Sequence, residues 1–331
     1  MKGEKAKRSY FVGCSAGGRE ALMEAQRFPG DFDGIVAGAT ANYNTLSTGG
    51  RAYMQQALAK PGGYLDTAQL QLLQTAALRQ CADGGPFIRD QMACHFDPSV
   101  LKCKAGQTEG CLTAPQIASA QAIYGGRVVG GKSMFPGYMP GAEAARGGWQ
   151  AWNTGTSKAT YAESAGHTIS SQFLKYFVYG DPSFDFLKMD LGPKYDRDRM
   201  KTSAVLDAVN ADLTPFKKHG GKLIQYHGWN DPAIPPLSAI RYYGEVNRKM
   251  GRTGDFYRLY MIPGMLHCQG GAGPGTVDWL GVLDHWVEAK AAPAELTATG
   301  PNGASQMLCP YPGVAKKAGD GWACSVGKKA G

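Results

Sequence analysis

Residues 9–18 read Ser-Tyr-Phe-Val-Gly-Cys-Ser-Ala-Gly-Gly, and they are the most informative stretch of the chain. The stretch starts with β-prone side chains and continues with small ones, and the following segment from Arg19 to Phe28 has the periodicity and composition of a helix. The order is therefore strand, sharp turn, helix. At the turn, Gly13 and Gly17 flank Ser15 in a G-x-S-x-G spacing, which we expect to make room for the strained backbone of a nucleophilic serine.

Two interpretations of this turn compete. Ser15 can be the nucleophile of an acyl-transfer enzyme, because the N-terminus of the following helix favours the negative charge of the intermediate, with the N–H of Ala16 as an oxyanion donor. The alternative is a glycine-rich β-turn, since the chain contains 46 glycines and the spacing arises easily by chance. The positions of possible catalytic partners help to decide between the two.

An aspartate and a histidine each follow a predicted strand. The segment from Lys222 to Gly228 is typical of a buried strand and precedes Asp231, and the segment from Phe256 to Ile262 precedes His267. Open α/β sheets carry functional groups at such strand ends. Serine, aspartate, histidine is also the chain order of the α/β-hydrolase triad. Taken singly, Asp231 could be a turn residue before proline and His267 a loop histidine.

The chain resembles the tannase and feruloyl esterase family of α/β-hydrolases, which also contains the enzyme that hydrolyses the mono-ester released from polyethylene terephthalate. The resemblance covers essentially the whole chain. It rests on residues 10–15 (YFVGCS), 24–38 (EAQRFPGDFDGIVAG), 94–98 (CHFDP), 111–113 (CLT), 226–231, 263–268 and 309–312 (CPYP). It implies Ser15 as nucleophile, His267 as general acid and base, and Asp231 as the residue that orients His267. The family hallmark is a disulfide between cysteines adjacent to the serine and the histidine, here Cys14 and Cys268.

The eight cysteines of the chain allow 105 pairings. Local clustering favours three short-range disulfides, Cys81 with Cys94, Cys103 with Cys111, and Cys309 with Cys324. These leave Cys14 for Cys268, the pair that the resemblance implies and that would hold the nucleophile turn against the histidine loop. No cysteine or histidine spacing typical of zinc sites occurs. Disulfides indicate an oxidising compartment, so we expect a secreted or periplasmic protein.

The pattern of predicted strands and helices changes twice along the chain. Residues 1–42 and 211–331 carry the strand and helix alternation of a hydrolase core, with helices predicted at Leu237 to Met250 and Val277 to Lys290. Residues 43–210 differ, with predicted helices at Leu65 to Arg79 and Pro115 to Tyr124 and a Gly, Pro and aromatic-rich stretch over 125–152. The prediction is an α/β-hydrolase core with an inserted domain, which by resemblance is a lid over the substrate pocket.

Aromatic side chains of the inserted domain are candidates for stacking on a phenolic ring, although most aromatic residues are ordinary packing residues. They are Phe135, Tyr138, Trp149, Trp152, Phe173, Tyr176 and Phe177. His227, four residues before Asp231, is a candidate for the wall of the substrate pocket. Many family members bind calcium through a repeated Asp-Gly loop after the first lid cysteine. Because the corresponding loop here offers only Asp83 and Asp90, we expect neither bound calcium nor another cofactor.

Only 14 residues precede Ser15, although the nucleophile of an α/β-hydrolase normally follows the fifth strand. The expected fold is therefore a hydrolase sheet truncated at its N-terminal side, with one oxyanion donor unaccounted for and activity impaired. The resulting sheet edge could pair with a second copy or a partner chain. The first residues contain basic side chains but no apolar stretch of the length that a signal peptide needs.

Composition narrows the class of protein. The chain has 331 residues, 43% of them hydrophobic, so it can bury a large core, and no stretch approaches a membrane span. The net charge of +8 comes from scattered basic residues, which indicates a solvated surface rather than a nucleic-acid site. We expect a serine esterase that acts on small aromatic esters, such as feruloyl or galloyl esters, through an acyl-enzyme. The alternatives are a catalytically silent remnant that binds phenolics and a serine peptidase on the same scaffold.

Overall fold

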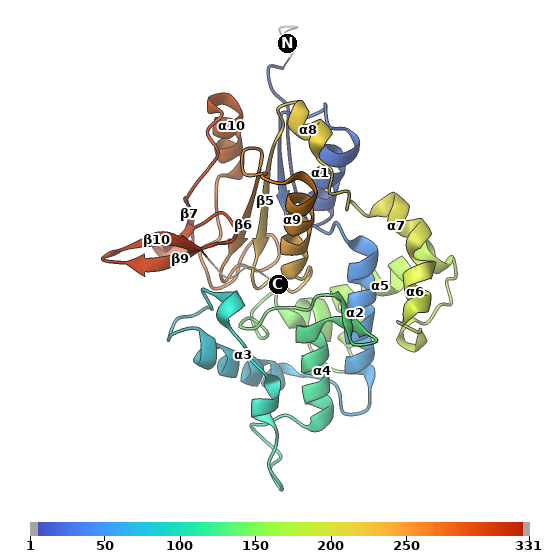
Figure 1. Cartoon of the computed structure of the whole chain (residues 1–331). Helices are drawn as coiled ribbons and strands as arrows, with labels where there is room; N and C mark the ends of the chain where they lie inside the picture. The colour runs from blue at the N-terminus through green and yellow to red at the C-terminus, as the bar shows by residue number, and fades with distance from the viewer. Residues whose placement is uncertain (1–5, 327–331) are drawn as a thin grey trace.

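A four-stranded parallel sheet organises the computed structural model, which describes residues 6–326 (Figure 1). The strand order is β1-β2-β5-β6, and every neighbouring pair is parallel. The strands are β1 (Tyr10–Cys14), β2 (Gly34–Gly38), β5 (Lys222–Gly228) and β6 (Tyr257–Ile262). The α/β fold predicted from the sequence is confirmed.

Helices cover both faces of this sheet, because consecutive strand residues point to opposite sides. Ile35 of β2 packs into a core with helices α1, α8 and α9, while the next residue, Val36, packs into a second core with α10. Figure 1 shows α10 on the opposite side of the sheet from α1, α8 and α9. The helices are α1 (Ala16–Arg27), α8 (Thr214–Lys218), α9 (Leu237–Met250) and α10 (Trp279–Ala289).

Residues 43–210, called the helical region below, lie beyond the carboxyl ends of the sheet strands (Figure 1). A separate hydrophobic core holds much of this region together, with Leu58, Leu73 and Ile123 among its buried members. The elements are α2 (Asn44–Ala59), α3 (Thr67–Cys81), α4 (Ala114–Gly125), β3 (Arg127–Val129), β4 (Lys132–Phe135), α5 (Ala165–Phe173), α6 (Pro193–Asp198) and α7 (Met200–Leu206), with π-helical segments at Gln150–Thr154 and Leu174–Tyr179.

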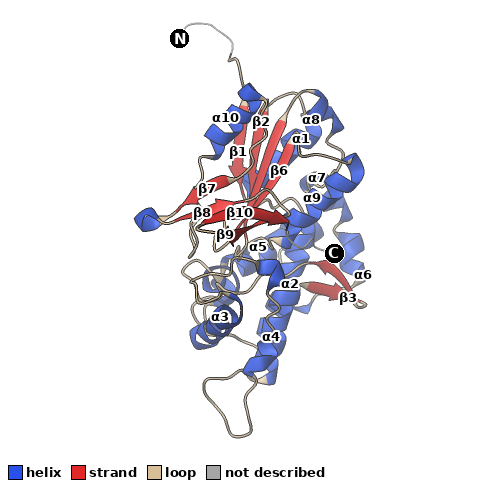
Figure 2. Ribbon diagram, turned by 60° about the vertical axis from the view of Figure 1, so that its left-hand side comes forward, coloured by secondary structure: helices blue, strands red, loops and turns tan. Residues whose placement is uncertain are grey.

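Two short antiparallel pairs complete the chain after α10 (Figure 2). They are β7 (Leu296–Thr299) with β8 (Ser305–Leu308), and β9 (Gly313–Ala318) with β10 (Gly321–Val326). Over residues 6–326, no helix combines the length and the apolar character needed to cross a membrane.

Candidate active site

Ser15 occupies the sharp turn between β1 and α1 and has a positive φ of 63°, which is rare outside glycine. Its backbone is fixed on both sides. The N–H donates to the carbonyl oxygen of Gly38 at 3.0 Å, and the carbonyl accepts from the N–H groups of Arg19 and Ala41, each at 3.1 Å. The side chain is partly exposed, so the turn presents the serine hydroxyl at the sheet edge where the helical region begins.

The glycines around Ser15 match the prediction from the sequence only in part. A side chain at Gly13 would place its Cβ 2.4 Å from the carbonyl oxygen of Gly17, so Gly13 is required, as expected. Gly17 itself has open space where a Cβ would be, and the expectation that it must be small is wrong. The crowded position is Gly18, whose Cβ would lie 2.2 Å from the carbonyl oxygen of Gly38.

Asp231 and His267 form the second part of the site. The Oδ2 atom of Asp231 lies 2.8 Å from Nδ1 of His267. The other carboxylate oxygen, Oδ1, accepts the backbone N–H groups of Ala233 and Ile234 at 2.8 and 2.9 Å. Burial alone would raise the pKa of the Asp231 carboxyl, but the hydrogen bonds from His227 and His267 hold that pKa well below its usual range. The carboxylate is therefore ionised and fixed in orientation.

The sequence analysis did not anticipate the two backbone donors to Asp231. They belong to a turn in which an aspartate side chain accepts N–H groups two and three residues later, a pattern that Asp231 followed by Pro232 could have signalled. His227 also differs from the expectation. It was a candidate for the pocket wall, but its side chain is fully buried, with Nε2 3.2 Å from Oδ2 of Asp231.

A disulfide connects the two halves of the site. Cys14 and Cys268 are bonded, with their Cα atoms 6.0 Å apart across a sequence separation of 254 residues. Because each cysteine is adjacent to a site residue, the bond brings Ser15 and His267 to neighbouring positions. In the part of the chain that the structure describes, no hydrogen bond yet joins the Ser15 hydroxyl to His267, and such bonds are often long in a free enzyme. The other disulfides are also the predicted ones, Cys81–Cys94, Cys103–Cys111 and Cys309–Cys324.

The helical region holds the aspartate loop through three side chains: Asn153 and Arg51, which were not predicted at the site, and Tyr138, which was predicted to stack on a phenolic ring. Asn153 donates to the carbonyl oxygen of Pro232 at 3.3 Å. The carbonyl oxygen of Ala233 accepts from the guanidinium of Arg51 at 3.3 Å and from the hydroxyl of Tyr138 at 3.1 Å. All three donors are buried, so the loop that carries Asp231 is fixed to the helical region as well as to the sheet.

Among the candidate aromatic residues, Trp152 contacts the site. Its ring packs edge-on against the imidazole of His267, with 5.0 Å between centroids and an angle of 73° between planes. Trp152 is carried by the π-helical segment Gln150–Thr154 and is partly exposed. Other candidates lie elsewhere: Phe135, Tyr138, Trp149 and Phe173 are buried, and Tyr176 and Phe177 are exposed by 58% and 60%.

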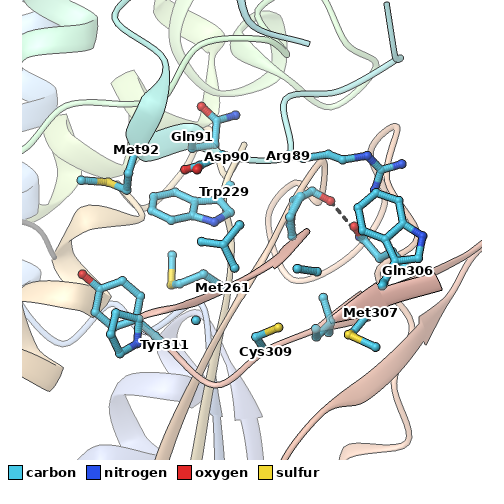
Figure 3. Close-up of a pocket in the computed structure, with 17 residues that line it drawn as sticks. Arg89, Asp90, Gln91, Met92, Trp229, Met261, Gln306, Met307, Cys309 and Tyr311 are labelled. Atoms are coloured by element: carbon cyan, nitrogen blue, oxygen red, sulfur yellow. Dashed lines mark hydrogen bonds between the residues drawn. The ribbon is translucent and has the colours of Figure 1, made fainter. Parts of the chain in front are cut away.

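Figure 3 shows a cavity near the end of β6, between Trp229, Met261 and Tyr311. Its volume is about 40 Å³, which suffices for a few water molecules but not for a phenolic ring. Ser15 and His267 do not line it. In residues 6–326, no group of three or more histidine, cysteine, aspartate and glutamate side chains is arranged to hold a metal ion.

The chain is similar in sequence to known proteins. The family model described as "Tannase and feruloyl esterase" matches residues 1–329. An uncharacterised esterase of Xanthomonas campestris pv. campestris is 35% identical over 88% of this chain and 58% of its own length. The mono(2-hydroxyethyl) terephthalate hydrolase of Piscinibacter sakaiensis is 31% identical over 96% of this chain and 62% of its own.

The fold is also similar to a solved structure. The crystal structure of feruloyl esterase B from Aspergillus oryzae superimposes with a TM-score of 0.83 and 26% identity, covering 96% of this chain and 70% of that one. The chain thus spans about three fifths of the length of the curated relatives that it matches.

Proposed function

Because the chain belongs to the tannase and feruloyl esterase family, we propose that it is a serine carboxylic-ester hydrolase acting on esters of aromatic acids, such as feruloyl or galloyl esters. The observation that carries the proposal is the hydrogen bond of 2.8 Å between Asp231 and His267, set beside Ser15 by the disulfide between Cys14 and Cys268. Two features support it: the serine turn is strained and partly exposed, and the carboxylate that orients the histidine is buried.

In the proposed mechanism, His267 removes the proton from the Ser15 hydroxyl as the oxygen attacks the ester carbonyl. Asp231 accepts the Nδ1–H of His267, which leaves Nε2 free to act as the base and stabilises the imidazolium that forms. Ala16 is the first residue of α1, where a backbone N–H has no partner within the helix, so it is available for the oxyanion. His267 then protonates the leaving alcohol, and water hydrolyses the acyl-enzyme through the same groups.

Trp152 supports an aromatic acyl group as the preferred substrate. Its partly exposed ring lies against His267, so an acyl group bound to Ser15 would come close to it. An aromatic acid could stack on this ring, which an aliphatic acid could not do. The four disulfides support a secreted or periplasmic location, because such bonds persist in oxidising compartments.

The test is hydrolysis of methyl ferulate, methyl gallate and a nitrophenyl ester by the chain and by its Ser15→Ala variant. We expect kcat to fall by at least about 1,000-fold in the variant, because the other triad residues cannot act without the nucleophile. Ser99→Ala changes an exposed serine of the helical region and should leave the rates unchanged. Trapping of an acyl group on Ser15, detected by mass spectrometry, would support the covalent route. Equal rates for the chain and Ser15→Ala would reject the proposal.

A further inference from the structure

The buried side chain of His227 contacts the aspartate loop at two points. His227 is the sixth residue of β5, and its side chain has no exposed surface. Its Nε2 atom lies 3.0 Å from the carbonyl oxygen of Ile234 and 3.2 Å from Oδ2 of Asp231. The bond to Ile234 is the better aligned of the two, and the carboxylate oxygen faces the same nitrogen. A single N–H group therefore serves both ends of the loop 231–234.

These contacts determine where the proton of the imidazole resides. A carbonyl oxygen and a carboxylate oxygen only accept hydrogen bonds, so Nε2 of His227 must carry a hydrogen. The other ring nitrogen, Nδ1, is buried and has no hydrogen-bond partner within residues 6–326. A second hydrogen on Nδ1 would be a buried, unsatisfied donor, which is costly. The geometry thus favours neutral His227 with its proton on Nε2.

Both carboxylate oxygens of Asp231 therefore contact hydrogen-bond donors. Its Oδ2 atom faces His267 at 2.8 Å and His227 at 3.2 Å, while its Oδ1 atom accepts two backbone N–H groups of the loop. Other polar groups near this cluster come from the helical region: the guanidinium of Arg51 and the hydroxyl of Tyr138, which both bond the loop carbonyl of Ala233. Among these groups, the N–H of His227 is the neutral donor that shares Oδ2 with the catalytic imidazole.

We propose that His227 is a positioning residue for the triad: its neutral Nε2–H closes the loop 231–234 and disperses the negative charge of Asp231 that faces His267. The proposal rests on the proposed function of Ser15, Asp231 and His267. It also explains a fully buried histidine at a strand end, which neither the hydrophobic core nor substrate contact requires.

Substitution by the two carboxamides provides a matched test. In His227→Gln the amide nitrogen can reach the position of Nε2 and donate to Ile234 and Asp231. In His227→Asn the amide nitrogen reaches only the position of Nδ1, where no acceptor lies. We expect kcat to fall by about 100-fold in His227→Asn and His227→Met with KM within about 3-fold, and by less than about 5-fold in His227→Gln. His285→Gln changes an exposed histidine of α10 and serves as the control.

The pH profile separates positioning from general structural damage. Without the donor, the charge of Asp231 acts more strongly on His267, so protonated His267 is favoured. The acid limb of kcat/KM should then move to higher pH by about 0.5 to 1 pH unit in His227→Met and stay in place in His227→Gln. Equal behaviour of the Gln and Asn variants, or an acid limb that does not move in His227→Met, would overturn the proposal.

Nitrogen NMR of ¹⁵N-histidine-labelled protein gives a readout that does not depend on activity. At the pH of the activity assay, His227 should carry its proton on Nε2, and a proton on Nδ1 would also overturn the proposal. The two proposals fail separately. An inactive Ser15→Ala variant together with a fully active His227→Met variant rejects only the role of His227, whereas a fully active Ser15→Ala variant rejects the proposed function.

Discussion

Cys14 and Cys268 are bonded to each other, and the residues beside them, Ser15 and His267, are the proposed nucleophile and base. Ser15 and Cys268 also share an unusual backbone conformation, with φ values of 63° and 62°. The disulfide therefore joins two turns that are each held at a positive φ, which a flexible loop would not maintain unaided.

Removal of this disulfide should lower kcat even under conditions where the variant protein remains folded. In Cys14→Ala/Cys268→Ala we expect kcat to fall at least about 100-fold, because the serine and the histidine lose their fixed separation. The free energy of unfolding should fall by at most about 5 kcal/mol, the chain-entropy value for a loop of this length. Hydrolysis kinetics and urea unfolding of the same samples measure both effects.

The matched control is Cys103→Ala/Cys111→Ala, which removes a disulfide of the helical region with a sequence separation of 8 residues. This change should cost about 2 to 3 kcal/mol and leave kcat unchanged at temperatures where the protein stays folded. Equal kcat losses in the two double variants would show that the bond at the site has no specific catalytic effect.

Two adjacent glycines should respond in opposite ways to alanine. Gly18→Ala would drive a Cβ into the carbonyl of Gly38, which also accepts the N–H of Ser15, so we expect a loss of about 3 kcal/mol or more together with lower activity. Gly17→Ala meets open space inside α1 and should stabilise the protein by up to about 1 kcal/mol with activity retained. Thermal unfolding of both variants tests the assignment; a destabilised Gly17→Ala variant would contradict it.

Trp152→Ala should weaken binding of aromatic esters. The indole packs edge-on against His267, where an aromatic ester could stack on it. Aromatic pairs contribute about 0.5 to 1.5 kcal/mol. We expect KM for methyl ferulate to rise about 3- to 10-fold, with a smaller effect for an aliphatic nitrophenyl ester. Trp152→Phe should recover part of the loss, and Tyr176→Ala, at an exposed position, should change nothing. An equal rise in KM for both esters would argue against stacking.

Asp231→Asn should reduce kcat by about 10⁴-fold, because the amide no longer holds His267 in the reactive tautomer. It should also change how stability depends on pH. The pKa of Asp231 is depressed in the folded protein, so its contribution to stability is present above the unfolded pKa of about 4 and is lost as pH falls through the folded value. Urea unfolding at pH 7 and at pH 3 should therefore show a smaller difference between the two proteins at the lower pH. If the difference in unfolding free energy were the same at pH 7 and pH 3, the ionisation of Asp231 would not contribute to stability.

The sequence predicted three of the four sheet strands, but not β2, and in the helical region it predicted α3 and α4. Alternating strands and helices with clear periodicity gave β1, β5, β6, α9 and α10 close to their observed bounds. Helix α2 was missed, because it contains Gly49 and Gly50, which are poor helix formers. The structure explains them: a Cβ at Gly49 would lie 2.3 Å from the ring of Tyr195, and Gly50 packs against Phe135. Such close contacts depend on tertiary structure and leave no periodic signal.

At the candidate site, too, residues that follow sheet strands were predicted more completely than residues of the helical region. The triad candidates Ser15, Asp231 and His267 were predicted from spacing and chain order, since each follows a strand. The disulfide between Cys14 and Cys268, which the family resemblance implied, is present. Arg51 and Asn153 were not found, because they reach the loop of Asp231 from helices whose placement the sequence does not reveal. The buried contact of His227 with Asp231 was not predicted, since a position near a strand end does not tell which side chains the following loop covers.

The contacts from Asn153, Arg51 and Tyr138 tie the helical region to the loop after β5. A hinged opening of the helical region as one body would break these buried bonds together and leave the carbonyls of Pro232 and Ala233 without these donors. Rotation of the partly exposed Trp152 side chain would break none of these bonds, so it would cost less free energy than such an opening.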